Sequence, residues 1–480
     1  MIRCSCSIRC APAWTHRRLR IESRIVRLHG YAVWAGIAMC DGFCKKFNRQ
    51  LVRFFETGRT AAGKDSSPNS GLKVNLMLLK TTHRHFAAAV SVLLASLTAM
   101  SPFAIDTYLS SMPTMAREFG VNINLIEITL TVYFLGFSLG NFIGGPLSDA
   151  FGRRKIALRG MMIYGAAAGG IPFCTGVYQI WVLRAVQAFG GGFATVTAMV
   201  FIRDWFEGKQ VARLATIIGM IMMLAPLFAP VIGTVLSETW GWRSIFIFML
   251  CFAGLLFLLF VFLVPESRAP ELLSRSLTPR QFVEKYRSFF SEKKAILLLF
   301  TISFSAGGLF TFITGSSFAY IEFFNVPSRV FPLVFGANIV FNVIISLANT
   351  IFLKWFEPEK MVRYALAAQL LAGVLLVLTA LGDTPSFWGF FTGIVVYIGS
   401  LGMIYGNATA LVLNQLPHIA GSANALIGVS RFVISFLAAS LPALLFNHTL
   451  VPICAVILGC AVVANLFFGL SQRPSAELNP

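Results

Sequence analysis

Long apolar segments follow one another along the chain from residue 86 to residue 470, and short polar segments separate them. A membrane-spanning helix needs about 20 mainly apolar residues to cross roughly 30 Å of hydrocarbon. The pattern therefore predicts an all-α integral membrane protein with twelve transmembrane helices. The predicted helices cover residues 86–113, 124–147, 156–174, 178–202, 213–237, 243–264, 294–320, 329–353, 361–381, 387–412, 421–446 and 450–470.

The longest polar interruption, residues 265–293, lies between the sixth and seventh predicted helices and carries six lysines and arginines. It divides the pattern into two halves of six helices each. We therefore expect an N-terminal six-helix bundle over 86–264 and a cytoplasmic linker over 265–293. A C-terminal six-helix bundle over 294–470 and a short cytoplasmic tail over 471–480 complete the predicted organisation.

The composition excludes an ordinary soluble protein, and the basic residues orient the helices. Of the 480 residues, 56% are hydrophobic and 12% are charged, about half the charged fraction of a typical soluble domain. After residue 73, 20 lysines and arginines flank one set of helix ends, whereas Arg117, Arg243 and Arg329 flank the other. Because cytoplasmic loops of membrane proteins collect lysine and arginine, we expect both termini in the cytoplasm.

The N-terminal segment differs from the rest of the chain. Residues 1–73 carry 14 lysines and arginines, four aspartates and glutamates, and five of the nine cysteines. The cysteine spacings match neither a zinc site nor a redox pair, and the single apolar run is too short to span a membrane. We expect residues 1–76 to be a disordered basic leader, or upstream sequence translated from a start codon set too early, with Met77 as the natural start. Nucleic-acid binding by this segment is not expected.

Charge is costly to insert into a membrane-spanning helix, and two of the ionisable residues inside predicted helices carry a functional prediction. Asp106 lies about 20 residues into the first helix, and Arg184 lies early in the fourth. Asp106 could take up and release protons, or it could be a helix-end cap or an ion-pair partner. Arg184 could hold an anionic partner or influence Asp106, or its side chain could extend to the membrane surface. We predict that both residues take part in proton coupling.

The loop between the second and third helices contains a distinctive string, Gly145-Pro-Leu-Ser-Asp149-Ala-Phe-Gly152-Arg153-Arg154-Lys155. Gly152 allows a tight turn, and Asp149 can pair with Arg153 or with the start of a neighbouring helix. Such a pair can stabilise one arrangement of two bundles and break in another. We predict that Gly145, Asp149, Gly152, Arg153 and Arg154 form a cytoplasmic gate. The alternative is that the three basic residues only orient the loop in the membrane.

The fifth predicted helix contains Pro226 and Pro230 on one face, followed by Gly233. Prolines four residues apart free two backbone carbonyls and bend the helix. A membrane tolerates such a break where neighbouring helices or a cavity satisfy the freed groups. We predict that this helix lies where the two halves meet. A purely structural kink is the alternative.

Uncharged polar residues recur in the second half. Asn338, Asn342, Ser346 and Asn349 follow one side of the eighth helix, which faces either another helix or water. Together with aromatic and polar residues of other helices they could line a substrate cavity. The predicted cavity residues are Tyr108, Phe310, Asn338, Asn342, Tyr405 and Asn407.

Motifs for catalysis are weak in this sequence. Gly136-Phe-Ser138-Leu-Gly140 matches the G-x-S-x-G string of serine hydrolases, but it falls in the middle of a helix without the strand-to-helix turn that the nucleophile needs. The sequence contains no phosphate-binding loop, zinc-site spacing or dinucleotide fingerprint. We therefore expect no enzyme, no metal and no cofactor, and a proton gradient rather than ATP as the energy source.

Residues 86–470 resemble the major facilitator superfamily, and specifically its bicyclomycin-resistance (Bcr/CflA) branch of drug:proton antiporters. Four motifs carry this resemblance, one in each of the first, fourth and fifth helices and one in the loop between the second and third. They are Asp106-Thr-Tyr108-Leu, the 145–155 string, Arg184-x-x-Gln187, and Ala225-Pro226-x-x-Ala229-Pro230-x-x-Gly233.

The resemblance implies two pseudo-symmetric six-helix bundles around a central cavity, which rock between inward-open and outward-open states. Asp106 would be the coupling carboxylate, Asp149, Gly152 and Arg153 would latch the cytoplasmic side, and the fifth-helix prolines would seal the interface between the halves. The implied function is proton-coupled multidrug efflux across the bacterial inner membrane, a form of antibiotic resistance.

Two other functions share this fold and remain open. The chain could export a native metabolite, such as a purine or amino-acid derivative, or it could import a nutrient by proton symport. The antiporter-like fifth helix speaks against symport. We expect a monomer whose partners are a small-molecule substrate, protons and the lipid bilayer, with no nucleic acid.

Overall fold

The computed structural model describes residues 84–205, 209–267, 289–416 and 420–473, and all regular elements within these ranges are helices. The predicted leader over 1–76 lies outside them, as do most of the predicted linker and tail.

The first half contains a broken first helix followed by five long helices. Its elements are α3 (Arg84–Asp106), η1 (Leu109–Ser111), α4 (Met112–Phe119), α5 (Ile123–Phe151), α6 (Arg153–Gly170), η2 (Ile171–Phe173), α7 (Val177–Trp205), α8 (Lys209–Trp240) and α9 (Arg243–Leu263). The second half contains six long helices and one π-helical turn. Its elements are α11 (Lys293–Ser317), η4 (Phe318–Phe323), α12 (Phe331–Phe352), α13 (Pro358–Leu381), α14 (Phe387–Gln415), α15 (Ala420–Leu444) and α16 (Val451–Ser471).

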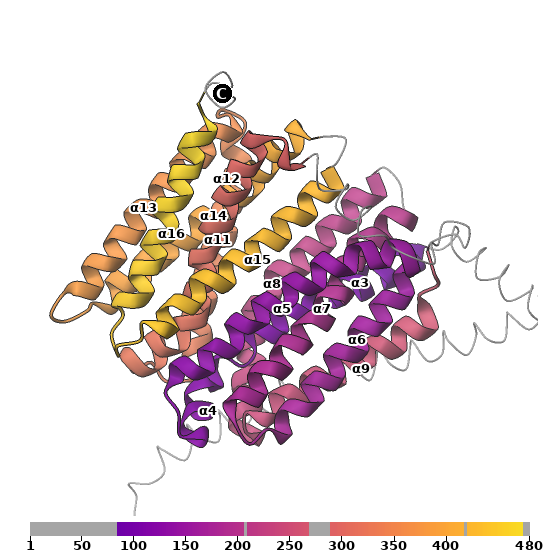
Figure 1. Cartoon of the computed structure of the whole chain (residues 1–480), viewed down its shortest axis with the longest axis horizontal. Helices are drawn as coiled ribbons and strands as arrows, with labels where there is room; N and C mark the ends of the chain where they lie inside the picture. Colours follow the sequence, from indigo (N-terminus) through magenta and orange to yellow (C-terminus); the bar gives the residue numbers. More distant parts are fainter. Residues whose placement is uncertain (1–83, 206–208, 268–288, 417–419, 474–480) are drawn as a thin grey trace, which may run out of the picture. The chain divides into compact units, whose positions relative to one another are not determined.

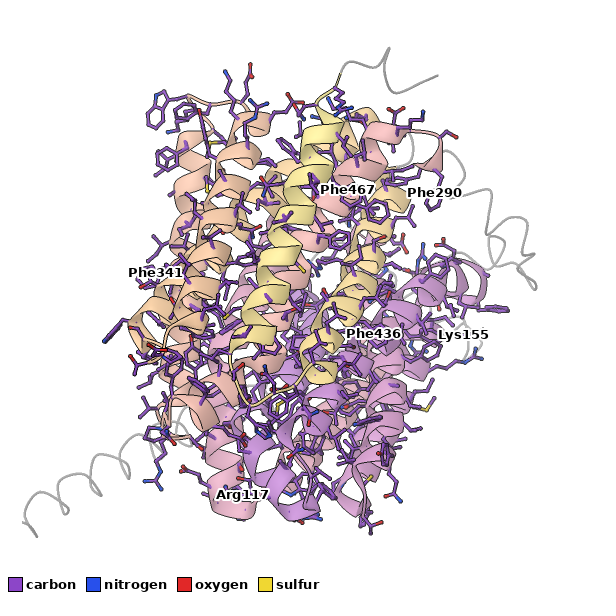
Figure 2. All side chains as sticks on the ribbon, turned by 60° about the vertical axis from the view of Figure 1, so that its left-hand side comes forward. Arg117, Lys155, Phe290, Phe341, Phe436 and Phe467 are labelled. Carbon is purple, nitrogen blue, oxygen red and sulfur yellow. The ribbon has the colours of Figure 1, made fainter. Side chains whose placement is uncertain are left out.

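Within the described ranges, eleven helical segments are long and apolar enough to cross a membrane. The helix at the fifth predicted position, α8, contributes a shorter apolar segment, Leu224–Trp240. Large apolar side chains are exposed on the outer faces, including Phe262 (77%), Leu371 (71%) and Phe341 (43%; Figure 2). Because a soluble protein rarely exposes extended apolar surface, these faces fit a lipid environment. The predicted all-α, membrane-spanning fold is confirmed.

Helices of each half pack mainly with one another (Figure 1). In the first half α7 packs against both α5 and α6, and α6 also contacts α9. In the second half α11 packs against α15 and α16, while α14 packs against α12 and α13. Residues that are far apart in sequence thus meet inside each half.

The two halves meet chiefly along α5 and α15, which run antiparallel (Figure 1). Asn124 Nδ2 donates to the Ala443 carbonyl at 3.0 Å, and Ser138 Oγ donates to the Val429 carbonyl at 3.0 Å. We call the end of the helices that carries Arg153 the Arg153 end, and the opposite end the Arg329 end. Figure 2 shows Arg117, at the Arg329 end, and Lys155, at the Arg153 end, on opposite sides of the first half.

The first predicted span, 86–113, corresponds to the candidate membrane span Val90–Phe119, and this segment is broken after Asp106. The α-helix ends at Asp106, a 3-10 turn follows at η1, and α4 then extends to Phe119. Pro113 occupies the first turn of α4, where its missing N–H costs nothing. Apolar residues lie on both sides of the break, so the hydropathy pattern could not reveal it.

Candidate functional site

Asp106 is the last residue of α3. Its side chain is 3% exposed, and its Oδ1 oxygen has no hydrogen-bond partner among the described residues. Buried polar atoms in proteins are nearly always hydrogen-bonded, so each exception needs an explanation. This carboxyl oxygen is available to a proton or to a donor group of a ligand.

The chain that follows Asp106 is held by α8. Gly233 packs so closely that a Cβ atom added to it would overlap the carbonyl oxygen of Thr107. Thr107 in turn donates its hydroxyl to the Phe103 carbonyl at 2.5 Å. Pro230, three residues before Gly233, is also buried. The helix with the antiporter-like motif therefore contacts the backbone one residue beyond the candidate proton site.

Arg184 has no exposed surface, although it lies within an apolar helix. Its Nη2 donates to the Ala104 carbonyl at 2.8 Å, two residues before Asp106. Its guanidinium carbon lies 4.5 Å from the ring centroids of both Tyr108 and Tyr133, within the range of cation–π attraction. Within the described part of the chain, no ion pair joins Arg184 to Asp106. Arg184 thus does not extend to the membrane surface, and it fixes the end of α3 instead.

Two neighbours extend this cluster across the first half. Gln187 Oε1 accepts a hydrogen bond from Arg184 Nη1 at 2.9 Å, and its Nε2 lies 3.4 Å from the Met249 sulfur. The Tyr108 hydroxyl lies 3.0 Å from Thr129 Oγ1. Tyr108 has no exposed surface, so the structure assigns it a packing role, and its contact with substrate stays a prediction.

The loop after α5 forms the ion pair that the sequence predicts, between Asp149 and Arg153. Arg153 also donates through Nη1 to Ser148 Oγ at 2.9 Å, and its Nε lies 3.4 Å from Asp204 Oδ2 at the end of α7. Gly152 has a φ of +104°, a conformation that favours glycine. Arg153 therefore ties three helix ends together at the Arg153 end.

Glu266 belongs to this cluster, and sequence reasoning missed it. Its Oε1 accepts from the Arg153 backbone N–H at 2.8 Å, and its Oε2 accepts from the Arg154 backbone N–H at 3.2 Å. A Cβ on Gly152 would lie 2.5 Å from Glu266 Oε2. A carboxylate at a helix N-terminus satisfies free N–H groups and complements the helix dipole. The available signal was one acidic residue just beyond the sixth helix.

The other two predicted gate residues are Arg154 and Gly145. Arg154 Nη2 donates to the Val261 carbonyl at 2.6 Å, so this side chain spans from α6 to α9. A Cβ on Gly145 would meet only Val196 within 4 Å, at 3.9 Å. Their roles in gating stay predictions.

The polar stripe of α12 faces a neighbouring helix, α14. Asn342 Nδ2 donates to the Ile398 carbonyl at 2.5 Å, and Asn407 Nδ2 donates to Asn349 Oδ1 at 2.9 Å. Asn338 is buried, and its Oδ1 has no hydrogen-bond partner among the described residues. Of the two alternatives for this stripe, the structure therefore shows the helix contact. Whether Asn338, Asn342 and Asn407 also reach substrate stays a prediction.

Four phenylalanines join the halves, and we call them the inter-half aromatic cluster: Phe134 and Phe137 on α5, Phe310 on α11 and Phe432 on α15. The ring of Phe310 lies 4.7 Å from that of Phe134 and 5.2 Å from that of Phe432. Phe137 lies 4.8 Å from Phe432. Phe310, predicted to line a cavity, is thus 8% exposed within this cluster. Tyr405, the last predicted cavity residue, is 37% exposed on α14.

A family model described as Major Facilitator Superfamily matches residues 94–439. The chain belongs to the major facilitator superfamily. Solved structures of the same fold include a D-xylose–proton symporter, with a TM-score of 0.63, 16% identity and coverage of 80% of this chain and 97% of that one. A bacterial homologue of the lysosomal transporter Spinster in an inward-facing, occupied conformation also has a TM-score of 0.63, with 13% identity and coverage of 82% and 98%.

Curated relatives place this member of the superfamily in the bicyclomycin-resistance branch, as its motifs indicate. The chain is 34% identical to a bicyclomycin resistance protein homolog of Haemophilus influenzae, over 79% of this chain and 95% of the relative. It is 25% identical to multidrug resistance protein D of Escherichia coli, over 74% and 88%. It is 24% identical to multidrug resistance protein MdtL of Citrobacter koseri, over 80% and 95%.

The superfamily motifs fall into two separate places in this structure. The motifs of the first, fourth and fifth helices meet around the break after Asp106, where Arg184 and Gly233 both contact the backbone. The loop motif gathers around Arg153 at one end of the helices. These two clusters are the candidate functional sites of the chain.

Proposed function

We propose that this chain is a proton-coupled antiporter that exports small amphipathic drugs across the bacterial inner membrane, with both termini in the cytoplasm. Membership of a transporter superfamily supports transport rather than catalysis. The fold alone does not choose the direction, because a sugar–proton symporter shares it. The relatives with the highest sequence similarity reported above are named for drug resistance, which favours export.

The observation that carries the proposal is the buried carboxyl group of Asp106. Its Oδ1 has no partner among the described residues, and the backbone on both sides of it is held, by Arg184 at Ala104 and by Gly233 at Thr107. A transported proton needs an acid group that it can bind and leave. An acid whose oxygen has no hydrogen-bond partner meets this need, and the backbone contacts on both sides of it connect it to α7 and α8.

The coupling step follows from this placement. Proton binding at Asp106 removes the negative charge from a buried site, and proton release restores it. Charge is costly away from water. The charged form of Asp106 therefore favours a conformation in which the break between α3 and α4 is open to water, and the protonated form favours one in which it is closed. The close contact between Gly233 and Thr107 passes any movement of this break to α8, which contacts α12 of the second half.

The energy source in this proposal is the proton gradient, with no cofactor, no metal and no chemical step. Each proton moved through 100 mV contributes about 2.3 kcal/mol, enough to hold a drug gradient of roughly fifty-fold. In this proposal the transporting unit is a monomer.

Labelled drug uptake into inside-out membrane vesicles tests the proposal. With respiration making the vesicle interior acidic, vesicles that contain the protein should accumulate at least one labelled amphipathic drug from a panel of cationic, neutral and anionic compounds, above vesicles from cells that lack it. A protonophore should abolish the accumulation, because the proton gradient drives it. Accumulation that survives the protonophore, or export from the vesicle interior under the same gradient, would refute proton-driven drug efflux.

A further inference from the structure

Arg431 lies near the middle of α15, a membrane-spanning helix. Its guanidinium carbon lies 4.9 Å from the ring centroid of Phe432 and 5.1 Å from that of Tyr405. Its Nε is buried without a hydrogen-bond partner, and no described carboxylate forms an ion pair with it. An arginine at this depth is costly and marks a functional site unless the protein neutralises it.

Comparison with Arg184 shows what Arg431 lacks. Both guanidinium groups lie against two or more aromatic rings. Arg184, however, donates to a backbone carbonyl and to a glutamine side chain, and it has no exposed surface. Arg431 has the rings but no acceptor among the described residues. The side chain of Arg431 is partly exposed, so its N–H groups are open to an acceptor that the described residues do not supply.

Arg431 lies on α15, the helix through which the second half contacts α5 of the first half. Two residues before it, the Val429 carbonyl accepts from Ser138 of the first half, and the next residue, Phe432, belongs to the inter-half aromatic cluster. On the same side of α15, a Cβ added to Gly428 would meet no heavy atom within 4 Å. Open space thus lies one turn from an arginine that lacks an acceptor.

We propose that Arg431 binds the anionic group of the transported substrate, a carboxylate, phosphate or sulfonate on an amphipathic aromatic molecule. A planar guanidinium presents paired N–H donors that match the two oxygens of such a group. The faces of Phe432 and Tyr405 beside it suit an aromatic part of the same ligand. This inference deepens the proposed function, on which it rests, by naming the class of substrate and the residue that selects it.

Two dyes with the same ring system and opposite charge test the inference on the purified protein in detergent. Fluorescein carries a free carboxylate, whereas rhodamine 6G carries an ester and a positive charge. By fluorescence polarisation, Arg431→Gln should weaken fluorescein binding at least tenfold and leave rhodamine 6G binding within twofold of wild type. Arg431→Lys keeps the charge without the paired donors, so its affinity for fluorescein should lie between those of wild type and Arg431→Gln. Arg329→Gln, which removes an exposed and already paired arginine, should bind both dyes like wild type.

A second variant keeps the test decisive if Arg431→Gln does not fold. Gly428→Leu leaves Arg431 unchanged and fills the open space, so it should weaken fluorescein binding severalfold. Wild-type protein that does not bind fluorescein, or equal fluorescein binding by wild type, Arg431→Lys and Gly428→Leu, would overturn the inference. Since the assay uses no proton gradient, fluorescein binding that depends on Arg431 would survive a failure of the proposed antiport.

Discussion

At the scale of single residues, two buried ionisable side chains of the first half, Arg184 and Asp106, are satisfied very differently. Arg184 has hydrogen-bond acceptors on two neighbours and two tyrosine rings around its guanidinium. Asp106 has an oxygen without a partner. Sequence reasoning found both residues, because charge stands out in an apolar helix. It could not assign their different roles, because these depend on contacts with residues up to 80 positions away.

Replacement of Arg184 should destabilise the protein. Arg184→Gln removes a charge-assisted hydrogen bond to Ala104 and the cation–π contacts with Tyr108 and Tyr133. We expect a loss of about 2–3 kcal/mol in the free energy of unfolding, seen as a lower thermal unfolding midpoint in detergent. Arg329→Gln breaks an exposed ion pair and should cost less than about 1 kcal/mol. Equal midpoints for the two variants would show that Arg184 is not a structural support.

At the scale of elements, the break between α3 and α4 and the approach of α8 to it define the coupling site. The proline and glycine positions of α8 were visible in the sequence, as was Asp106. Their contact was not, because it joins residues more than 120 positions apart through the backbone of Thr107. Helix periodicity reports which residues share a face, but it does not report which neighbour that face meets.

Gly233 should tolerate no side chain. In Gly233→Ala the added methyl group overlaps the Thr107 carbonyl, so α8 must move away from the break. Overpacking of this kind costs about 1–3 kcal/mol, and we expect drug uptake into inside-out vesicles to fall about tenfold at equal protein content. Gly219→Ala on the same helix is the matched control, because a Cβ there meets nothing within 4 Å. Similar uptake by both variants would contradict the close contact at Gly233.

Glu266 should stabilise the start of α6. In Glu266→Gln the side chain loses the charge that faces two backbone N–H groups, of Arg153 and Arg154. We expect a loss of about 1 kcal/mol in the free energy of unfolding, typical of a helix N-terminal contact. Glu292→Gln is the control, because Glu292 precedes α11 and its side chain makes no capping hydrogen bond. If Glu292→Gln lowers the thermal unfolding midpoint more than Glu266→Gln does, Glu266 does not stabilise the start of α6.

At the scale of the whole molecule, α5 and α15 join the halves through hydrogen bonds at the Arg329 end and near the middle of the helices. Ser317 adds a hydrogen bond to the Leu109 carbonyl at 2.5 Å, and Arg329 adds an ion pair with Glu238 at 2.9 Å. Transport by rocking of two halves requires contacts of this kind to separate in part of the cycle. These contacts are therefore those of a state that is closed at the Arg329 end.

A covalent link across this contact should stop transport. Asn124 and Ala443 lie on facing helices that a hydrogen bond joins at this point, so cysteines at both positions should form a disulfide in an oxidant and hold the halves together. We expect uptake into inside-out vesicles to fall to background after oxidation and to return with a reducing agent. Each single cysteine variant is the control and should be insensitive to oxidant. Full uptake by the cross-linked protein would show that this contact does not open during transport.

Much of the whole-molecule arrangement could be predicted from sequence. Apolar segments of about 20 residues fix where helices cross the membrane, and the polar linker after residue 264 separates two sets of six. The hydropathy pattern does not report where a spanning segment departs from one regular helix, as after Asp106 and in the π-helical turn at Phe318–Phe323. Glu266 was missed for a related reason, since its role depends on the folded position of a helix end more than 100 residues away.

Drug-evoked proton movement in inside-out vesicles tests the central claim, that Asp106 carries the coupled proton. A pH-sensitive dye in respiring vesicles should report proton release when drug is added to wild type and to Asp383→Asn, a matched change at an exposed aspartate. In Asp106→Asn, with the same amount of protein in the membrane, the account predicts that the drug evokes no proton release. Wild-type proton release in Asp106→Asn would contradict it and would move the coupling site to another residue.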